Sequence, residues 1–531
     1  MYLIGLTMRE NVSSIPFRAR AAAILAAWLA LAGCSVGPKF VKPAPPLKKE
    51  WSGAAGPWIE VRTRPDSAWW SVFADPVLDS LVRQSYHQNL SLRIVGLRIV
   101  EARAQLAVAV GNQFPQVQAL LGSAMAARQS ENSPNAAVSG GSYLDYRLGF
   151  DAAWEADLWG KFRSDVQAQS AQLLATAAEY DNALVSLAAE VARTYAMIRT
   201  FEVLLEQAAR NIRVQEEGVK IAQARFGAGA TSELDVTQSR TLLESTRATV
   251  PQLEIGLIQA QNALSTLLGR PTGDLKALLR TSKGIPAAPG TIPVEMPAGL
   301  LQRRPDVRNA EFLAIAQNAR IGVAKADFYP RFTLFGSIGL QATSGVDGVS
   351  ANLFDPGSLF YTAGPRLIWP ILNYGRIGNN VRVQDARLQQ ALVHYENTVL
   401  IAAREVEDGL AGYLKSREAE ASARAAAISA ARSVELSLIQ YREGAVDYLR
   451  VLEAQRSQLE EDNALANAQS AIATNLISLY KALGGGWELR RGQPVLPDST
   501  RKEMQGRTDW GTMLSSPSAP EKSQAPTSKD R

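Results

Sequence analysis

Very few side chains of this 531-residue chain are of the types that carry nucleophilic or metal chemistry. It contains one cysteine, Cys34, and two histidines, His87 and His394. Both histidines lie in polar, helix-like stretches, without the HExxH, CxxC or GxSxG spacing of zinc sites and hydrolase nucleophiles. The many Asp and Glu residues stand near Lys and Arg, which is typical of solvated helix faces. The sequence therefore predicts a protein that is not an enzyme, with no catalytic residue, metal ion or cofactor.

Cys34 is the one residue whose position indicates a specific reaction. Two arginines and an apolar run, within residues 18–31, are followed by small residues directly before Cys34. This arrangement predicts a secretory signal peptide over residues 1–33, too short to span a membrane as a helix. The sequence Leu-Ala-Gly-Cys resembles the lipobox of bacterial lipoproteins, whose new amino-terminal cysteine is acylated. The resemblance implies a covalent lipid on Cys34, and Ser35 in place of Asp implies sorting to the outer membrane.

Composition excludes two further classes of protein. A single cysteine allows no intrachain disulfide, so an exported form must be stabilised by packing and assembly. The formal charge of +5 is small for this length. No dense Lys/Arg stripe interleaved with aromatic residues is present, so the sequence predicts no nucleic-acid partner.

Two segments of low complexity flank the chain's body. Prolines at 38, 43, 45 and 46 predict an extended, lipidated tether over residues 34–74. A Ser-, Pro- and Lys-rich composition predicts a disordered tail over residues 488–531.

The body contains two similar halves at a fixed offset of 215 in residue number, the difference between Trp154 and Trp369. Residues 154–161 match 369–376 without a gap, and the same offset matches Leu268-Gly269 to Leu483-Gly484. One register held over most of each half predicts a tandem structural repeat. Repeat 1 is assigned to residues 75–269, a linker to 270–296 and repeat 2 to 297–487.

Each repeat is predicted to run helix, two strands, very long helix, tight turn, helix. In repeat 1, residues 75–111 read as one helix, with Asp75-Pro76 as N-cap and first helical residue. Prolines are absent from 161–250 and from 371–493, where good helix formers abound. A helix over residues 161–226 would measure about 100 Å. So long a helix needs lateral partners, as a coiled coil or a helical barrel supplies.

The strand segments alternate apolar and polar residues. From Leu144 to Trp154 every even position is apolar, and residues 331–341 and 359–369 repeat the pattern. Strands of this length and period occur in transmembrane sheets, and equally in soluble sheets with one wet face. Two strands per repeat give four per chain, too few to close a membrane barrel, whose smallest forms have about eight strands. Several chains must then share a barrel, and three copies would supply twelve strands.

A series of short motifs follows a fixed order between Cys34 and Trp487. The motifs are Cys34-Ser-Val-Gly-Pro, Arg303-Arg-Pro-Asp-Val-Arg308, Phe328-Tyr-Pro330, Gly364-Pro365 running to Trp369-Pro370, Asn373-Tyr-Gly-Arg376, and Tyr441-Arg-Glu-Gly444 leading to Leu449-Arg-Val-Leu-Glu-Ala-Gln-Arg456. Together they resemble the TolC-like outer-membrane efflux channels, and more narrowly the NodT-type lipoprotein branch.

The resemblance implies an α+β membrane protein that forms a homotrimer. Three chains with four strands each would build a twelve-stranded transmembrane β-barrel in the outer membrane of a Gram-negative bacterium, continued by a long periplasmic α-helical barrel. It implies a passive channel of a tripartite efflux system for drugs or other small molecules. The implied partners are outer-membrane lipid, a periplasmic adaptor (membrane fusion) protein and an inner-membrane pump of the RND type.

Each long helix ends in a short turn whose glycine, Gly229 or Gly444, predicts a positive φ. A phosphate-binding loop is disfavoured, because no Lys-Ser/Thr follows the glycines of the first turn. The resemblance implies that both turns form the periplasmic tip, where the pore closes and the adaptor docks. Some relatives carry Arg two positions after the second glycine; this chain has Val446, so that lock is absent or replaced.

The resemblance places the pore constriction at Leu449, Glu453 and Arg456. Their spacing of i, i+4 and i+7 puts them on one helix face. In a trimer, Leu449 would form an apolar ring and Glu453 an acidic ring that favours cations. Alternatively, Leu449 packs in a coiled coil and Glu453 forms a solvated pair with Arg456. Asp235 corresponds to Arg450 in the offset, which predicts an opposite-charge pair that holds the aperture shut.

Two other functions share many of these features. A periplasmic coiled-coil structural or adhesive lipoprotein would contain Cys34 and the long helices, but would not need alternating apolar strands in two matched places. A type I protein-secretion channel is a third possibility within the same family. The lipoprotein branch favours small-molecule efflux, with substrate choice lying mainly in the pump.

Overall fold

The computed structural model describes residues 36–44, 48, 50–52, 56, 58–61, 68–128, 130, 132, 142–273, 275–280, 284–294, 303–344 and 352–514. The predicted signal peptide, Cys34 and residues 515–531 lie outside the described residues. The chain divides into two compact units, one of residues 1–41, 104–172 and 313–391, the other of residues 42–103, 173–312 and 392–531.

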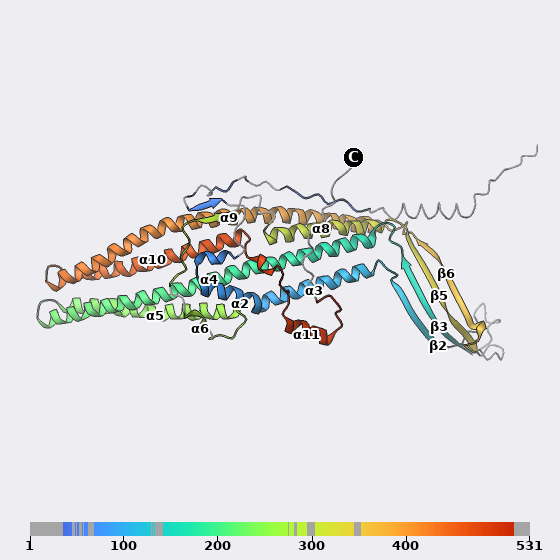
Figure 1. Ribbon diagram of the computed structural model, residues 1–531, viewed down its shortest axis with the longest axis horizontal. Coiled ribbons are helices and arrows are strands. Elements are labelled where there is room, and N and C mark those ends of the chain that lie inside the picture. Colours follow the sequence, from blue (N-terminus) through green and yellow to red (C-terminus); the bar gives the residue numbers. More distant parts are fainter. Residues whose placement is uncertain are drawn as a thin grey trace, which may run out of the picture. The chain divides into compact units, whose positions relative to one another are not determined.

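The first unit contains a four-stranded antiparallel sheet in the order β2-β3-β5-β6 (Figure 1). The strands are β2 (Val117–Arg128), β3 (Ser142–Glu155), β5 (Arg331–Ser344) and β6 (Leu359–Ile368), the last preceded by the short helix η2 (Pro356–Ser358). The three strands predicted from the alternating pattern are therefore present, and β2 is the fourth strand expected from two per repeat. Within one chain, β2 and β6 form the two edges of the sheet.

The long helices of the two halves have equal lengths and begin at positions separated by the offset of the repeat. The pairs are α3 (Leu90–Gly111) and α8 (Pro305–Ala326), of 22 residues each; α4 (Lys161–Gly227) and α9 (Arg376–Arg442), of 67; and α5 (Glu233–Leu267) and α10 (Tyr448–Ala482), of 35. From α3 and from α8 onward, the predicted order of helix, two strands, long helix, turn and helix is observed in each half. Among the described residues, no helix combines the length and apolar composition needed to cross a membrane.

The core of the second unit is built around tryptophans that the sequence assigned to the tether. Trp69 and Trp70 of η1 (Trp69–Phe73) are fully buried, and the Trp69 ring stacks on Tyr480 with centroids 5.4 Å apart. Strand β1 (Ile59–Val61) pairs in parallel with β4 (Ile292–Val294), which follows the short helix α6 (Lys276–Leu279). Only part of residues 34–74 is therefore tether, because burial of large aromatic surfaces draws the rest into the core.

Residues 75–111 form two helices where the sequence predicted one. Asp75 caps α2 (Pro76–Gln88) with its side chain, as expected. The backbone then breaks at Asn89, whose ψ is 125°. The Asn89 Oδ1 accepts the N–H of Leu92 at 2.7 Å and so caps the start of α3. Because the asparagine side chain accepts a free N–H at the start of α3, the break costs little free energy.

Asn89 and Arg304 occupy matching positions and make matching contacts. Asn89 Nδ2 donates to the carbonyl of Leu267 at 2.9 Å, and Arg304 Nη1 donates to that of Ala482 at 2.8 Å. Each carbonyl belongs to the last residue of its helix, α5 or α10. In both halves, the residue directly before one helix therefore donates a hydrogen bond to a free carbonyl at the end of another helix.

The predicted disordered tail is ordered over residues 488–514, here called the C-terminal strap. It begins within η3 (Trp487–Arg490) and contains α11 (Asp498–Arg507). Its buried side chains Leu496, Met504 and Leu514 cluster with Val100 of α3. The segment is polar on average, so its composition did not indicate these few spaced apolar residues. They are enough to bury one face of the strap against α3.

Two glycines directly opposite each other, Gly149 and Gly339, let β3 and β5 pair closely. A Cβ on Gly339 would lie 2.4 Å from the carbonyl oxygen of Leu148 and 3.0 Å from the Phe360 ring. We expect Gly339→Ala to lower the free energy of unfolding by about 1–3 kcal/mol, because backbone must shift to admit the methyl group.

Gly336→Ala is the matched control on the same strand, since the nearest atom to a Cβ there is 3.8 Å away. Denaturant titration in detergent, followed by the β-sheet circular dichroism signal, measures both variants. Equal midpoints for the two would contradict the expectation.

Candidate functional site

One face of the sheet is apolar and exposed. The strand register makes Leu120, Phe150, Ile338 and Tyr361 neighbours in a row across all four strands. Tyr361 is 79% exposed and Leu120 75%. The larger apolar side chains of this face, which we call the apolar face, are Leu120, Leu144, Tyr146, Leu148, Phe150, Trp154, Phe332, Leu334, Ile338, Leu340, Leu359, Tyr361 and Leu367. Apart from Arg128 at the end of β2, the described strand residues on this face carry no charge.

The opposite face carries the other strand charges, and several of them bond to neighbouring polar side chains. Ser337 Oγ donates to Asp151 Oδ1 at 2.5 Å and accepts from Arg147 Nη2 at 3.2 Å. Asp145 Oδ1 accepts from Gln341 at 3.1 Å and from Thr343 at 2.9 Å. We call this the polar face. An uncovered apolar face opposite a hydrogen-bonded polar face is the arrangement of a sheet between lipid and water.

Tryptophans mark the junctions between strands and helices in the first unit. Trp159 stacks on Tyr329 with centroids 4.6 Å apart, and its Nε1 donates to the carbonyl of Pro330 at 2.8 Å. Trp154 Nε1 donates to the carbonyl of Gln113, and Trp369 Nε1 to that of Phe328, so one contact recurs at the offset of the repeat. Rings with a satisfied polar edge are typical of membrane–water boundaries.

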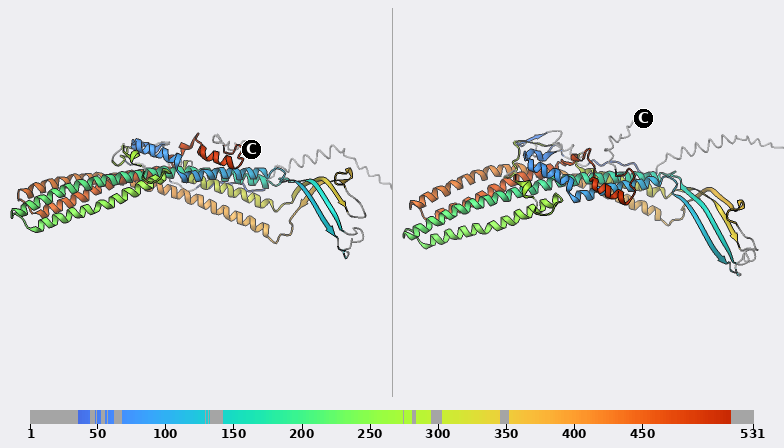
Figure 2. Two further views of the ribbon diagram at one scale, coloured as in Figure 1. Left: turned by 90° about the horizontal axis from the view of Figure 1, so that it is seen from below. Right: turned by 60° about the horizontal axis from the view of Figure 1, so that its bottom comes forward.

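In the second unit, the α4–α5 and α9–α10 hairpins end side by side in matching turns (Figure 2). Gly229 and Gly444 have φ values of 72° and 77°, which glycine adopts without strain. In each turn a backbone N–H five residues on closes the helix end: Ala230 bonds to the carbonyl of Arg225 and Ala445 to that of Gln440, both at 2.8 Å.

Tyr441 is the centre of the small core that joins the two hairpins. Its ring packs edge-on against Tyr448 at 5.2 Å, among Ala222, Val236, Leu242, Val451 and Leu452. Its hydroxyl donates to Asp235 Oδ2 at 3.3 Å. Burial raises the pKa of Tyr441, and raises that of Tyr448 to about 12. Both phenols therefore keep their protons at neutral pH and act as donors.

The residues predicted for the constriction lie exposed at the start of α10. Leu449 is 52% exposed, and Glu453 and Arg456 are also exposed. Glu453 Oε2 lies 3.5 Å from Arg450 Nη1, so Arg450, and not Arg456, is the cation beside it in the chain.

Asp235 and Arg450 are not brought together within one chain. Asp235 accepts hydrogen bonds from Tyr441 and from Thr231, while Arg450 stands beside Glu453. Tyr441 was predicted only as part of a motif, and the sequence did not indicate its packing role. The signal that could have found it is an aromatic residue just before the turn in both halves, Phe226 in the first and Tyr441 in the second.

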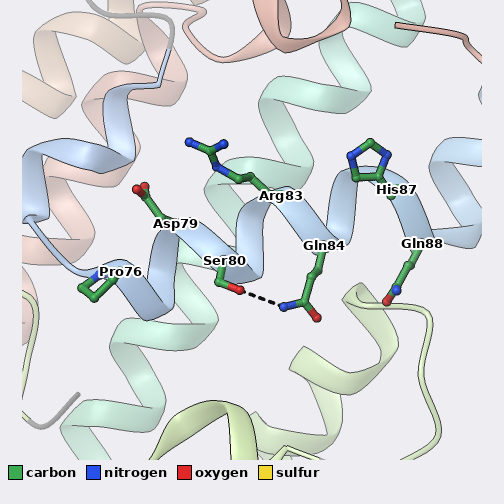
Figure 3. A pocket seen from close by; sticks show the side chains of 7 residues that line it. All are labelled: Pro76, Asp79, Ser80, Arg83, Gln84, His87 and Gln88. Atoms are coloured by element: carbon green, nitrogen blue, oxygen red, sulfur yellow. Dashed lines mark hydrogen bonds between the residues drawn. The ribbon is translucent and has the colours of Figure 1, made fainter. Parts of the chain in front are cut away.

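His87 and His394 are both exposed on helices. His87 borders an open hollow of about 440 Å³ along α2, together with Asp79 and Arg83. Figure 3 shows the residues that line this hollow. Among them, Gln84 Nε2 donates a hydrogen bond to Ser80 Oγ at 2.8 Å. In the part of the chain that the structure describes, no three His, Cys, Asp or Glu side chains are grouped to hold a metal ion.

Comparison with known proteins identifies relatives of the whole body. The model of the family described as outer membrane efflux protein matches residues 81–270 and 297–485. The solvent efflux pump outer membrane protein SrpC of Pseudomonas putida is 33% identical over 476 residues, or 87% of this chain and 97% of the relative. The probable outer membrane lipoprotein SilC of Salmonella typhimurium is 28% identical over 467 residues, or 86% and 96%.

Solved structures agree with this result. The outer-membrane channel OprN matches with a TM-score of 0.79 and 31% identity, over 86% of this chain and all of that one. The two stretches matched by the family model are the two halves found in the sequence, and the match leaves out the tether and the C-terminal strap.

Leu120 and Leu121 provide a test of the two faces, because these adjacent residues lie on opposite sides of β2. We expect Leu120→Arg, on the apolar face, to destabilise the folded protein in a bilayer by up to about 2–4 kcal/mol, since a charge would enter hydrocarbon. Leu121→Arg, on the polar face, is the matched control and should be tolerated. Denaturant unfolding from lipid bilayers measures both, and equal losses would argue against lipid contact at the apolar face.

Proposed function

Because the chain belongs to the outer membrane efflux protein family, we propose that it is the passive outer-membrane channel of a tripartite efflux system. It would carry drugs or other small molecules delivered by a periplasmic adaptor and an inner-membrane pump of the RND type. The observation that carries this proposal is the four-stranded sheet with one exposed apolar face. A coiled-coil adhesive lipoprotein would have no use for such a sheet.

The edges of the sheet support a trimer. Backbone groups along β2 and β6 need partners in lipid, where each unpaired group costs several kcal/mol. The four strands alternate in direction, so β6 of one chain runs opposite to β2 of the next and can pair with it antiparallel. Three chains would then close a barrel of twelve strands.

The matching helices support the tandem repeat. Equal lengths for three pairs of helices, all at one offset, are expected if both halves are copies of one structural unit. In a closed ring, six such units from three chains would stand around one axis. The long helices would then line the periplasmic part of the conduit.

A lipid on Cys34 fits the place of the residues that follow it. Val36 N–H lies 3.5 Å from the carbonyl of Trp159, and Asn318 Nδ2 donates to the carbonyl of Pro38 at 2.8 Å. These contacts lie within the unit that holds the sheet. An acylated cysteine two residues before Val36 in sequence would therefore start near the proposed membrane boundary. The name of SilC, an outer membrane lipoprotein, adds support.

The exposed start of α10 supports a constriction at the tip. Leu449 and Glu453 are available to face a lumen, as an apolar ring and an acidic ring of three copies each. The apolar ring would hinder wetting, and the acidic ring would attract cations and repel anions. The Asp235–Arg450 pair would then form between neighbouring chains, where helices of the two repeats alternate. The turns at Gly229 and Gly444 would offer the docking surface for the adaptor.

Conductance in planar bilayers tests the channel and its selectivity together. The unsubstituted protein should migrate as a heat-modifiable trimer and prefer cations in a salt gradient. Glu453→Ala should move the reversal potential towards zero, because the acidic ring is lost. Glu435→Ala removes the same charge from an exposed pair with Arg432 on α9 and should leave the potential unchanged. A monomer without conductance would exclude the proposed function, and an unchanged potential for Glu453→Ala would exclude only the ring.

A further inference from the structure

Arg225 extends from the end of α4 to the end of α9. Its Nη1 donates to the backbone carbonyl of Tyr441 at 2.6 Å and to that of Arg442 at 3.3 Å. Its guanidinium carbon lies 4.8 Å from the centre of the Tyr441 ring. One side chain of the first hairpin therefore holds both the backbone and the ring of the last turn of the second.

A cation is well suited to this position. The last carbonyls of a helix lack intrahelical partners and carry the negative end of the helix dipole. Hydrogen bonds from a charged donor are stronger than neutral ones, and a cation over an aromatic face adds further attraction. The contact should therefore hold the end of α9 more firmly than an exposed ion pair, such as that of Arg442 with Glu217, would hold it.

The second turn leaves room for the guanidinium. A Cβ built on Gly444 would lie 3.5 Å from Arg225 Nη1 and 3.6 Å from Nη2. The equivalent Cβ on Gly229 would have no neighbour within 4 Å. A side chain longer than a methyl group would therefore meet Arg225 at position 444, but not at position 229.

The two hairpins differ at this point. The residue that corresponds to Arg225 in the second repeat is Gln440, which is exposed and uncharged. Val446, two residues after Gly444, is also uncharged. The charge between the two hairpins is thus supplied by Arg225 of the first hairpin. The second hairpin has an uncharged residue at both position 440 and position 446.

We propose that Arg225 is a positioning residue that keeps the proposed constriction closed. This inference rests on the proposed function. The restraint passes from Arg225 to the Tyr441 ring, from that ring to the Tyr448 ring, and along α10 to Leu449, the next residue. When the Arg225 contact is lost, the end of α9 is released, and Leu449 and Glu453 move away from the pore axis with α10.

The first test compares the time-averaged conductance of full-length variants in planar bilayers. Arg225→Ala should raise it on the order of tenfold, as expected for loss of a charged hydrogen bond that favours the closed state. Arg225→Lys keeps a donor for the carbonyls but not the planar group, so it should restore part of the closure. Arg442→Ala removes an equal charge from an exposed pair, and Gln440→Ala alters the matching position; both should conduct like the unsubstituted protein. An Arg225→Ala channel as closed as the unsubstituted one would overturn the proposal.

The second test keeps Arg225 and removes its space. Gly444→Asn and Gly492→Asn place the same side chain at φ values of 77° and 76°, which asparagine tolerates, and a Cβ on Gly492 would have no neighbour within 4 Å. Only Gly444→Asn should raise the conductance. Equal conductance in the two variants would contradict the role of Arg225, even if Arg225→Ala proved unable to fold.

Hydrogen exchange separates this proposal from the channel itself. Amides of residues 438–446 should exchange faster in Arg225→Ala than in Arg442→Ala, while the melting temperature of the trimer stays the same. A purely structural role would lower the melting temperature and leave the open fraction unchanged. Absence of conductance in every variant, Gly444→Asn included, would reject the channel. If the Arg225→Ala and Gly444→Asn variants conduct and stay closed for as much of the time as the unsubstituted protein, only the positioning role would be rejected.

Discussion

The unpaired backbone groups along the outer edges of β2 and β6 are the constraint on which the rest of the molecule depends. In water such edges invite aggregation, and in lipid they are too costly to leave open. The sheet meets this constraint with a division of chemistry between its faces. Asp145, Arg147 and Asp151 bond to polar side chains of β5 on the polar face, which leaves the apolar face free of charge through its central part. Pro365 of β6 is the one residue of the two edge strands that lacks a backbone N–H for pairing.

The two halves share backbone geometry but differ in the side chains that stabilise it. Helix lengths agree residue for residue, and the Trp154 and Trp369 contacts recur at the same offset. The helix-end contact is neutral at Asn89 and charged at Arg304, which also bonds to Glu405 and Asp306 at 2.7 Å. The same geometry can therefore be held by either kind of donor. A charge at a helix end changes the local field without changing the fold.

Alternation, proline-free stretches of helix formers and the match between the two halves were enough to predict the long helices and the number of strands. Alternation and helical spacing depend only on near neighbours in sequence, and the match between the two halves supplied each pattern twice. The break at Asn89 was missed because good helix formers surround it. Burial of Trp69 and Trp70, and of the strap residues Leu496 and Met504, was missed because composition averages over a segment. These side chains pack against residues distant in sequence, and single-sequence patterns contain no information about such partners.

The tip marks the limit of prediction from the sequence most clearly. The spacing of Leu449 and Glu453 put them on one helix face, and the structure shows both side chains exposed, but the cation beside Glu453 is Arg450 and not Arg456. Arg450 and Arg456 each lie three residues from Glu453, and which of them approaches its carboxylate depends on side-chain conformation. The contact from Arg225 to Tyr441 joins residues 216 positions apart, and no local pattern indicates it.

The C-terminal strap has a consequence for how this protein matures. Val100 and Leu97, near the beginning of the chain, are covered by residues from its last part, and Arg103 bonds to the carbonyl of Met513 across 410 positions. Synthesis and export proceed from the amino terminus, so α3 keeps an uncovered apolar flank until the strap has been made and packs against it. A prematurely terminated polypeptide would display that flank permanently to chaperones and proteases. The strap thus distinguishes a polypeptide that extends to residue 514 from one that stops before it.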